Sequence, residues 1–309
     1  MPAASRKVIP FSKYHGLGND FVVIDALHSP ALLRKDWLTL SRAMCDRRLG
    51  IGADELLLLS ASQTHDVTMR VFNADGTDGG MCGNGIRCIA RHMVETHAFK
   101  RDILRVDVWG VGDRPVRIHR EKARFAAAEV DMGEPAFTPA AVPFAPSLAN
   151  TKLHDEPAAI NAPLPAALRK QLGAHARSLT TMTCVSMGNP HAVLWCTNPT
   201  RELVELAGPI LQRAKVFPKS VNVHVAAIRS RSHATMWTYE RGAGVTLACG
   251  TGACAVLVAG VLAKRLSRQA TITVPGGDLR VRWDAATSRV FKTGPGAFVF
   301  AGEYGLSSK

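Results

Sequence analysis

The chain has 309 residues, of which 47% are hydrophobic, which is enough for one large or two ordinary domains with filled cores. Lys and Arg outnumber Asp and Glu by 38 to 25, but they are scattered singly or in pairs, which indicates a solvated basic surface and argues against a nucleic-acid-binding stripe. No stretch has the length and apolarity of a membrane span, and the first ten residues lack the apolar core of a secretory signal, so we expect a soluble, cytoplasmic protein with no membrane or nucleic-acid partner.

Apolar runs in the first half of the chain predict mainly strands. These are residues 21–25, 55–59, 67–72, 103–109, 116–119 and 129–132. Asp36 is a candidate N-cap for a helix over Trp37–Cys45, and a second helix is expected over Gly85–Thr96. Because Arg87, Arg91 and His92 lie on this second helix, we expect it to be incompletely enclosed.

The second half of the chain opens with a Pro- and Ala-rich passage over residues 135–165, which predicts a connection with an inserted surface loop. Strands are then expected over residues 181–186, 192–196, 220–226, 235–239, 270–274, 278–283 and 297–301. Residues 251–263 carry no charge on any face. A helix that is apolar all round must be enclosed, which predicts a sheet curled around one central helix.

Two pairs of segments repeat in the same order. Met81 to Cys88 reads MCGNGIRC and Ala248 to Cys254 reads ACGTGAC, and the offset between their first cysteines is 249 − 82 = 167 residues. GNDFVVI from Gly18 resembles GNPHAVL from Gly188, at an offset of 188 − 18 = 170 residues. Two landmarks at nearly one spacing indicate a duplicated domain. If the halves pack about a pseudo-twofold axis, Cys82 and Cys249 would occupy related positions.

Each of these two cysteines directly precedes a Gly-x-Gly turn that leads into a predicted helix. At a helix N-terminus, unpaired backbone N–H groups and the helix dipole favour a thiolate and offer a seat for an anion. A zinc site within either segment is disfavoured, because at about 100° per residue Cys82 and Cys88, or Cys249 and Cys254, point to different faces of a helix. The Cys-x-x-Cys pattern of redox pairs is absent.

Several residues near the two cysteines have two readings. The Glu240-Arg241 pair is either a surface ion pair or a binding site for the charged groups of an amino acid. His191 is either a core histidine with satisfied hydrogen bonds or a proton-shuttling neighbour of one thiol. The remaining cysteines are interpreted as small buried core residues: Cys45, Cys88, Cys184, Cys196 and Cys254.

The ordered set of motifs resembles the diaminopimelate epimerases, of the cofactor-independent amino-acid racemase superfamily. The matching segments span nearly the whole chain: HGLGNDF from His15, RLGIG from Arg48, FNADG from Phe72, CGNG from Cys82, GNPH from Gly188, VNV from Val221, ERGAG from Glu240 and CGTG from Cys249. Each motif is weak alone, whereas the ordered set is specific.

The resemblance implies epimerisation of LL-2,6-diaminopimelate to the meso form, in lysine and peptidoglycan synthesis, without pyridoxal phosphate, metal or other cofactor. One cysteine, as thiolate, would remove the α-proton and the other, as thiol, would return a proton to the opposite face. Cys82 and Cys249 match the catalytic pair, and His191 and Glu240 match the residues that assist them. The substrate-binding positions that the resemblance implies are Asn19, Glu55, Asn73, Gly83, Asn84, Asn189, Asn222, Glu240, Arg241, Gly250 and Thr251.

The implied fold is α+β, with two pseudo-symmetric domains that each curl a mostly antiparallel sheet around a central helix. We expect an N-terminal half over residues 1–127, completed by a C-terminal strand over 293–309, and a second half over 128–292. The implied active site lies in a cleft between them, which closes over the substrate. The resemblance also implies a homodimer.

Some positions depart from the family pattern. Glu55 stands where Gln is common, Val245 where Glu is expected, His224 where a smaller residue is usual, and Gly79-Gly80 replaces a more polar lead-in. These departures leave open a racemase acting on another amino acid such as histidine or proline. Four residues that would bind the second amino-acid group of diaminopimelate argue against such a racemase, because a substrate with one amino-acid group would leave them unpaired. They are Asn73, Asn189, Asn222 and Arg241. A catalytically silent binding protein is disfavoured because both cysteines are present.

Overall fold

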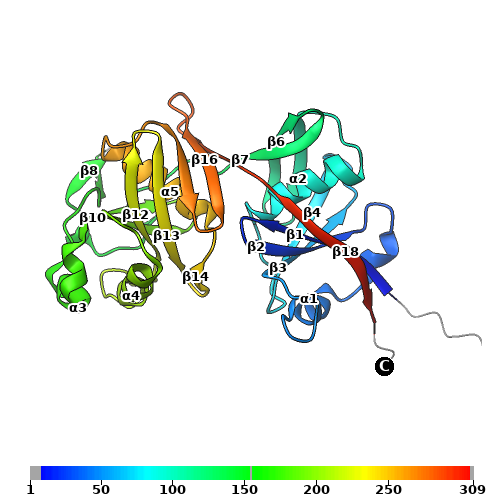
Figure 1. Ribbon diagram of the computed structural model, residues 1–309, viewed down its shortest axis with the longest axis horizontal. Helices are drawn as coiled ribbons and strands as arrows, with labels where there is room; N and C mark the ends of the chain where they lie inside the picture. The colour runs from blue at the N-terminus through cyan, green and yellow to red at the C-terminus, as the bar shows by residue number, and fades with distance from the viewer. Residues whose placement is uncertain (1–7, 154, 307–309) are drawn as a thin grey trace, which may run out of the picture. The chain divides into compact units, whose positions relative to one another are not determined.

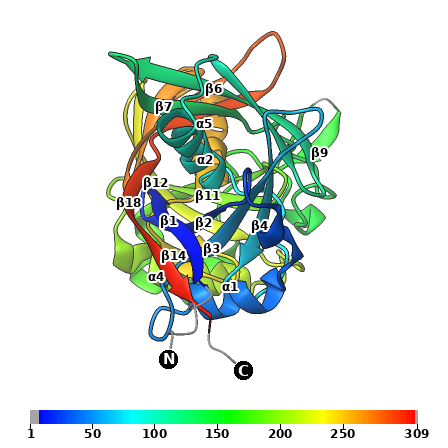
Figure 2. The ribbon, with the colours of Figure 1, turned by 90° about the vertical axis from the view of Figure 1, so that its right-hand side faces the viewer.

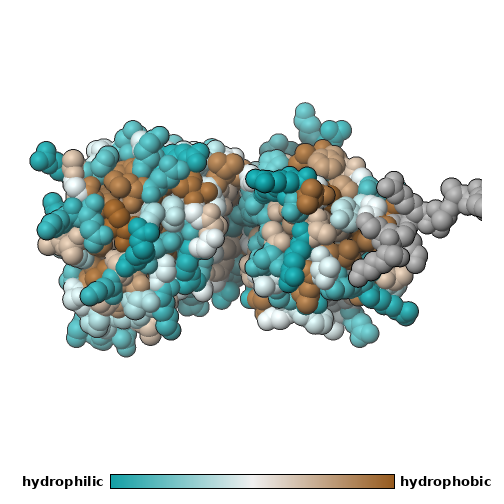
Figure 3. Space-filling model, turned by 90° about the horizontal axis from the view of Figure 1, so that it is seen from below, coloured by the Kyte–Doolittle hydropathy of each residue, from teal (hydrophilic) through white to brown (hydrophobic). Residues whose placement is uncertain are grey.

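The computed structural model describes residues 8–153 and 155–306. The chain separates into two compact units, of which unit 1 is Met1–Val130 together with Gly294–Lys309 and unit 2 is Asp131–Thr293. No helix among the described residues is long and apolar enough to cross a membrane. On the face drawn in Figure 3, hydrophilic side chains cover much of both units, with apolar residues in smaller patches among them.

The described residues of unit 1 form a sheet and two α-helices (Figures 1 and 2). In spatial order its strands are β18 (Ala297–Gly305), β1 (Val8–Gly16), β2 (Asn19–Asp25), β3 (Glu55–Ser60), β4 (Val67–Asn73), β5 (Ile103–Val108), β6 (Gly112–Glu121) and β7 (Arg124–Asp131). Neighbouring strands are antiparallel except β2 with β3 and β4 with β5. Each parallel pair is joined by a crossover with a helix, first α1 (Trp37–Cys45) and then α2 (Gly85–Thr96).

Unit 2 repeats this plan. Its strands are, in spatial order, β10 (Leu179–Ser186), β11 (Pro190–Cys196), β12 (Asn222–Ser230), β13 (His233–Glu240), β15 (Gln269–Val274), β16 (Gly277–Trp283) and β17 (Val290–Gly294), with β14 (Gly244–Thr246) paired to β13. The parallel pairs are β11 with β12 and β13 with β15, and their crossovers contain α4 (Arg201–Gln212) and α5 (Gly250–Leu262). The strands β1 to β7 and their counterparts in unit 2 therefore pair in the same order and directions, which confirms the predicted duplication and fold class.

The remaining elements are short. They are the hairpin β8 (Thr151–Leu153) and β9 (Glu156–Ala158), helix α3 (Ala166–Leu172), and the 3₁₀ turns η1 (Pro30–Arg34), η2 (Pro146–Leu148) and η3 (Gly173–Arg177). Every strand predicted from the sequence has a counterpart, and Asp36 caps α1 by accepting a hydrogen bond from the Thr39 backbone N–H at 3.2 Å. The sequence did not predict strands β1, β8, β9, β14 and β17 or helices α3 and α4.

Helix α5 is the centre of unit 2, as its uncharged sequence predicted. Gly250 and Gly252 to Gly260 are all buried, and the helix contacts β10, β11, β12, β13, β15 and β16. The prediction that α2 is less completely enclosed holds for its C-terminal half, where Arg91 is half-buried and Glu95 and Thr96 are exposed, but not for Arg87 and His92. Arg87 and His92 are 0% and 3% exposed. Both can be buried because each has hydrogen-bond partners within unit 1.

The segment over residues 135–165 connects β7 to β10, as predicted, and residues 150–152 and 155–157 in it are exposed, but it is not a surface loop throughout. Ala136 forms an isolated bridge with Ser186 of β10, and Ala162 forms another with Met182. Buried apolar side chains from this segment, among them Val142, Phe144 and Leu164, join the core that covers β10 and β11. The Pro- and Ala-rich composition therefore contributes a layer of irregular, packed backbone to unit 2.

Strand β18 forms one edge of the sheet in unit 1, alongside β1 (Figure 2). Three consecutive apolar residues of this strand are exposed, namely Phe298, Val299 and Phe300, by 44%, 50% and 44%. An edge strand with exposed apolar side chains is a surface on which another chain can pack or pair.

Candidate active site

Cys82 lies three residues before α2 and is buried. Its Sγ accepts a hydrogen bond from the Gly85 backbone N–H at 3.3 Å, so the thiol is held against the first turn of the helix, as the Gly-x-Gly pattern predicted. Its thiol also points to Asn19 Oδ1, 4.0 Å away, and the Glu55 side chain at the start of β3 lies near enough to raise its pKa.

Cys249 has the same setting in unit 2. It is the N-cap residue of α5, is 3% exposed, and donates a hydrogen bond from its thiol to Glu240 Oε2 at 3.1 Å. Thr251 Oγ1 lies 3.7 Å from the sulfur. The other oxygen of Glu240 accepts a hydrogen bond from Thr246 Oγ1 at 2.5 Å, which fixes the carboxylate beside the thiol.

The expectation that the helix N-termini would favour the thiolates is not met in this structure. Burial raises the pKa of the Cys82 thiol well above its usual range, and the charge of Glu55 raises it further. Burial and Glu240 do the same to the pKa of Cys249. Hydrogen bonds from Gly85 and Gly252 lower these pKa values but are outweighed. The helix N-termini therefore favour the thiolates less than burial and the nearby carboxylates disfavour them.

A buried arginine organises the turn after Cys82. Arg87 donates to the Gly83 carbonyl and Asn84 Oδ1 at 3.1 and 2.8 Å, and also to the carbonyl of Pro295 at 3.1 Å. Asn84 Nδ2 in turn donates to Asn19 Oδ1 at 3.1 Å. From the sequence, Arg87 was expected on a helix that is incompletely enclosed. The burial of Arg87 could not be predicted from its position after the glycine turn, because it depends on the carbonyl groups that accept its hydrogen bonds.

The other predicted residues of unit 1 lie on neighbouring strands. Asn19 begins β2 and Asn73 ends β4, where it faces Glu55 across the strand pair. Asn73 Nδ2 donates to Thr77 Oγ1 at 2.9 Å, and Asn19 Nδ2 donates to Asp54 Oδ2 at 2.8 Å. Unit 1 thus brings Asn19, Asn84 and Glu55 to the Cys82 thiol.

His191 is fully buried in unit 2, and both of its ring nitrogens have partners. Nε2 lies 2.8 Å from Asn189 Oδ1, and Nδ1 lies 2.8 Å from Nε2 of His224, whose Nδ1 lies 2.9 Å from Thr238 Oγ1. Burial lowers the pKa of His191 well below its usual range, and the pKa of His224 to about 3. Two neutral imidazoles therefore form a relay in which Thr238 donates to His224, His224 to His191, and His191 to the Asn189 oxygen.

Asn222 and Arg241 are joined at the same end of the unit 2 sheet. Asn222 Oδ1 accepts a hydrogen bond from the Arg241 backbone N–H at 2.8 Å, and its Nδ2 donates to the Pro190 carbonyl at 3.0 Å. The Arg241 side chain is exposed and donates to the Lys219 carbonyl at 3.1 Å. Gly250 and Thr251 form the first turn of α5 beside Cys249. The predicted site residues therefore fall into one group in each unit.

The remaining cysteines are all free thiols and all buried, as their interpretation as core residues predicted: Cys45, Cys88, Cys184, Cys196 and Cys254. Cys88 and Cys254 lie inside α2 and α5 and are 0% exposed.

A family model described as diaminopimelate epimerase matches residues 11–138 and 183–299. The chain belongs to the diaminopimelate epimerase family. The predicted family and the predicted class of enzyme, an isomerase acting on an amino acid, are thereby confirmed. Curated relatives named diaminopimelate epimerase include one from Carboxydothermus hydrogenoformans, 40% identical over 96% of this chain and 99% of its own length, and one from Moorella thermoacetica, 39% identical over the same shares.

Solved structures share the fold of this diaminopimelate epimerase family member at low identity. A phenazine biosynthesis protein of the PhzF family from Bacillus anthracis is similar with a TM-score of 0.71 and 14% identity, covering 97% of this chain and 100% of that one. A hydroxyproline epimerase from Agrobacterium vitis is similar with a TM-score of 0.63 and 14% identity, covering 98% and 94%. These likenesses support the fold and no particular substrate.

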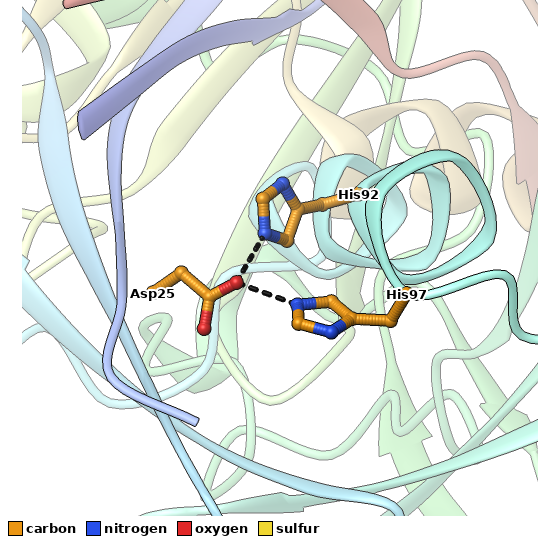
Figure 4. A group of neighbouring side chains, drawn as sticks. All are labelled: Asp25, His92 and His97. Atoms are coloured by element: carbon orange, nitrogen blue, oxygen red, sulfur yellow. Dashed lines mark hydrogen bonds and ion pairs between the residues drawn. The ribbon is translucent and has the colours of Figure 1, made fainter. Parts of the chain in front are cut away.

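One further cluster of titratable side chains lies at the far ends of β2 and α2 from Cys82 (Figure 4). Asp25 Oδ2 lies 3.0 Å from His92 Nε2 and 2.5 Å from His97 Nε2, and Tyr14 Oη lies 3.1 Å from His92 Nδ1. Within the described parts of the chain this is the one trio of His, Cys, Asp or Glu with metal-ligand spacing, and it includes no cysteine. Its hydrogen bonds tie β1, β2 and α2 together.

Proposed function

We propose that this chain epimerises LL-2,6-diaminopimelate to meso-diaminopimelate, with Cys82 and Cys249 as the two acid–base groups at one α-carbon. One thiolate removes the α-proton, and the other thiol supplies a proton to the opposite face of the carbanion. The product would serve lysine and peptidoglycan synthesis.

One observation carries this proposal: in each half of a duplicated fold, a buried thiol stands at the N-terminus of the central helix with a glutamate beside it. Two equivalent acid–base groups are what a stereochemical inversion at one carbon requires. A thiol serves in either direction, because its reference pKa near 8.5 lies close enough to neutrality for both protonation states to be reached.

The α-proton of an amino acid is very weakly acidic, so the carbanion needs electrostatic stabilisation. We assign this to the backbone N–H groups of Gly83-Asn84 and Gly250-Thr251, at the starts of α2 and α5. Such groups bind a carboxylate and stabilise the charge that develops on it when the proton leaves. Because they are fixed by the helices, they need no reorganisation during the reaction.

The second head of diaminopimelate carries its own carboxylate and ammonium groups. We assign its recognition to the polar residues at the strand ends: Asn19, Asn73, Asn189, Asn222, Glu240 and Arg241. Arg241 is suited to a carboxylate because its guanidinium is exposed while its backbone is anchored by Asn222. His191 holds the side-chain oxygen of Asn189, so it acts here by positioning that amide.

We also propose a cytoplasmic homodimer. The seven cysteines, all free in this structure, are suited to a reducing compartment. The exposed apolar side chains on the edge strand β18 are suited to burial against a second copy. Sedimentation of the wild-type chain and of Phe300→Asp tests the dimer, which the charged variant should weaken.

The decisive experiment is exchange of the α-proton with deuterated solvent, followed by NMR over LL-diaminopimelate, histidine, proline and glutamate. We expect exchange and inversion of diaminopimelate alone. Turnover of histidine or proline in preference to diaminopimelate would instead assign the chain to a racemase of another amino acid, to which Glu55 and His224 would be adaptations. No exchange with any of the four would overturn the proposal.

A further inference from the structure

Two imidazoles converge on one carboxylate oxygen at the C-terminal end of α2 (Figure 4). Asp25 Oδ2 lies 3.0 Å from Nε2 of His92 and 2.5 Å from Nε2 of His97. Because an ionised carboxylate only accepts hydrogen bonds, both imidazoles carry a proton on Nε2 and donate it to the same oxygen. All three atoms lie within 4.8 Å of one another, a spacing that a single metal ion can bridge.

The backbone fixes two of these side chains in place. Asp25 is the last residue of β2, and its other oxygen, Oδ1, accepts a hydrogen bond from the Leu27 backbone N–H at 3.0 Å. His97 is the C-cap of α2, where its backbone N–H donates to the Met93 carbonyl at 3.2 Å. The chain then turns at Ala98, which has a φ of 51°. Asp25 Oδ2 and His97 Nε2 are therefore held toward one point by the local backbone.

His92 is enclosed in unit 1, and its ring is oriented from the opposite side. It is 3% exposed, and its Nδ1 lies 3.1 Å from the Tyr14 hydroxyl on β1 and 3.4 Å from Thr96 Oγ1. A hydroxyl group both donates and accepts, so it satisfies Nδ1 whether this nitrogen carries a proton or a lone pair. A metal-binding histidine has such a contact at its other nitrogen, because that contact sets which nitrogen faces the ion.

The chemistry of the three ligands selects the kind of ion. Imidazole nitrogens suit Zn²⁺ and the neighbouring transition ions, whereas Ca²⁺ and Mg²⁺ prefer sites made of oxygen atoms. Bonds of about 2.0–2.1 Å around a tetrahedral ion separate its ligand atoms by about 3.3 Å. The separations from Asp25 Oδ2 are 3.0 and 2.5 Å, so an ion between the ligands requires His97 Nε2 to shift by less than about 1 Å.

A cation is favoured at this place and can reach it. The last turn of α2 presents the negative end of the helix dipole to the site. The side chains of Asp25 and His97 are 26% and 17% exposed, so an ion can enter from solvent and keep a water molecule as a further ligand. The exposed ring of His28 lies next to the site, with its centre 5.6 Å from that of His97. The site is thus open on one side and closed by His92 on the other.

We propose that Asp25, His92 and His97 bind one Zn²⁺ ion, or a related divalent transition ion, which stabilises unit 1. The ion joins the end of β2 to the C-terminal end of α2 and replaces the two hydrogen bonds that Asp25 Oδ2 accepts. Each imidazole then gives the lone pair of Nε2 to the ion and carries its proton on Nδ1, from which His92 donates to Tyr14. The inference does not depend on the proposed function, because these residues lie at the opposite end of α2 from Cys82.

The first test is titration of the metal-free protein with ZnCl₂ by isothermal calorimetry. The wild type should bind one ion tightly. Tyr14→Phe should weaken this binding by about 10- to 100-fold, because it removes the hydroxyl that orients His92, and His97→Gln, which removes a ligand, should weaken it more than about 100-fold. Absence of tight binding by the wild type, or equal affinities of the wild type and His97→Gln, would overturn the proposal.

Two controls separate this site from other groups that bind zinc. His65→Gln removes a comparable histidine of unit 1, which is paired with Asp113 at 3.2 Å and has a side chain 14% exposed, but which belongs to no trio of ligands in the described parts of the chain. This variant should keep the wild-type affinity. Thiols also bind zinc, so the double variant Cys82→Ala, Cys249→Ala is titrated as well and should bind one ion as tightly as the wild type. Binding that is lost in the double variant and kept in His97→Gln would assign the ion to the thiols and overturn the proposal.

The second test uses the wild-type protein alone, so it does not depend on the folding of a variant. Long-range ¹H–¹⁵N NMR spectra distinguish the two neutral forms of an imidazole. As zinc is added, the signals of His92 and His97 should change from the Nε2–H form to the Nδ1–H form, while those of His65 stay unchanged. The melting temperature should rise by about 5 °C at a zinc concentration about 100 times the dissociation constant. Unchanged signals of His92 and His97 at saturating zinc would overturn the proposal.

Discussion

Glu240 Oε2 accepts a hydrogen bond from the thiol of Cys249 at 3.1 Å, and Thr246 holds the other oxygen of the same carboxylate. The first residue is at the end of β13 and the second is the N-cap of α5. A helix N-terminus and a carboxylate act on this thiol in opposite senses, since one favours the thiolate and the other opposes it. The pKa of Cys249 is raised, so burial and the Glu240 carboxylate together outweigh the effect of the helix N-terminus.

Replacing either of the two proposed catalytic cysteines with alanine should abolish epimerisation. Cys82→Ala and Cys249→Ala each remove one of the two acid–base groups, and such groups contribute about 10²- to 10⁴-fold in rate. Cys88→Ala and Cys254→Ala are the matched controls, because these thiols point into the cores of the units from the same two helices. Chiral analysis of the product, with circular dichroism to check folding, measures the effect. Full turnover by folded Cys249→Ala would exclude the two-thiol mechanism.

Arg87→Met should strongly destabilise unit 1. The substitution leaves the Gly83 and Pro295 carbonyls and the Asn84 side chain without a charged donor, at about 1.5–3 kcal/mol for each hydrogen bond. We expect a loss of at least about 3 kcal/mol in the free energy of unfolding, measured by urea denaturation. The control is Arg201→Met, whose exposed ion pair with Glu205 at i, i+4 is worth only about 0.5 kcal/mol. Similar losses in both variants would contradict the role of Arg87 described above.

Arg241→Ala tests the recognition of the second amino-acid head. Losing a charge-assisted hydrogen bond costs about 1.5–3 kcal/mol, so kcat/KM for diaminopimelate should fall at least about tenfold. Exchange of a single-headed amino acid, even if slow, should fall much less, because it never makes the contact. The exposed guanidinium predicts little change in thermal stability. Equal losses for both kinds of substrate would mean that Arg241 supports the fold or the chemistry.

Acid should destabilise unit 1 through Asp25. Burial would raise the pKa of this carboxyl, but hydrogen bonds from His92, the Leu27 backbone and His97 outweigh it and lower the pKa below its usual value. A carboxyl with a lowered folded-state pKa contributes stability that is complete above its unfolded pKa of about 3.9 and is lost as the pH falls toward the folded value. Urea midpoints at pH 7, 4 and 3 should fall for the wild type and fall less steeply for Asp25→Asn. Parallel curves for the two proteins would disprove the assignment.

Removal of metal ions should leave the activity intact. The proposed chemistry uses only proton transfers between thiols, carboxylates and the substrate, so dialysis against EDTA should not change the rate of exchange. The cluster of Asp25, His92 and His97 gives a variant for this test, since His97→Gln removes one possible ligand at the opposite end of α2 from Cys82. A rate that falls on dialysis and returns with zinc would show that a metal takes part.

The parts of the fold that sequence predicted well are those governed by local patterns. Asp36 and α1, the uncharged α5, and the two cysteine turns each depend on neighbouring residues, and all were placed correctly. Helix α4 was missed because it contains Gly208-Pro209, a pair that favours a helix end. Here the glycine is required by packing, since a Cβ at Gly208 would lie 2.2 Å from the Tyr239 ring.

The motifs predicted which residues form the site but not how they contact one another. Those contacts join residues that are far apart in the sequence. Nothing near Glu55 in the sequence indicates Cys82 as its partner, and the burial of Arg87 depends on the carbonyl of Pro295, more than two hundred residues away. The duplication made Cys82 and Cys249 recognisable as a pair. It did not reveal that their glutamates come from different strands of the repeat.

The placement of β18 in unit 1 has a consequence for synthesis of the chain on the ribosome. Unit 2 is continuous in sequence and can fold as soon as residue 293 has emerged, whereas the sheet of unit 1 must wait for residues 297–305. Arg87 meets the Pro295 carbonyl only at that stage. The half of the protein that is translated first is thus the last to be completed, and until then the turn that holds Cys82 lacks one of the backbone contacts of its buried arginine.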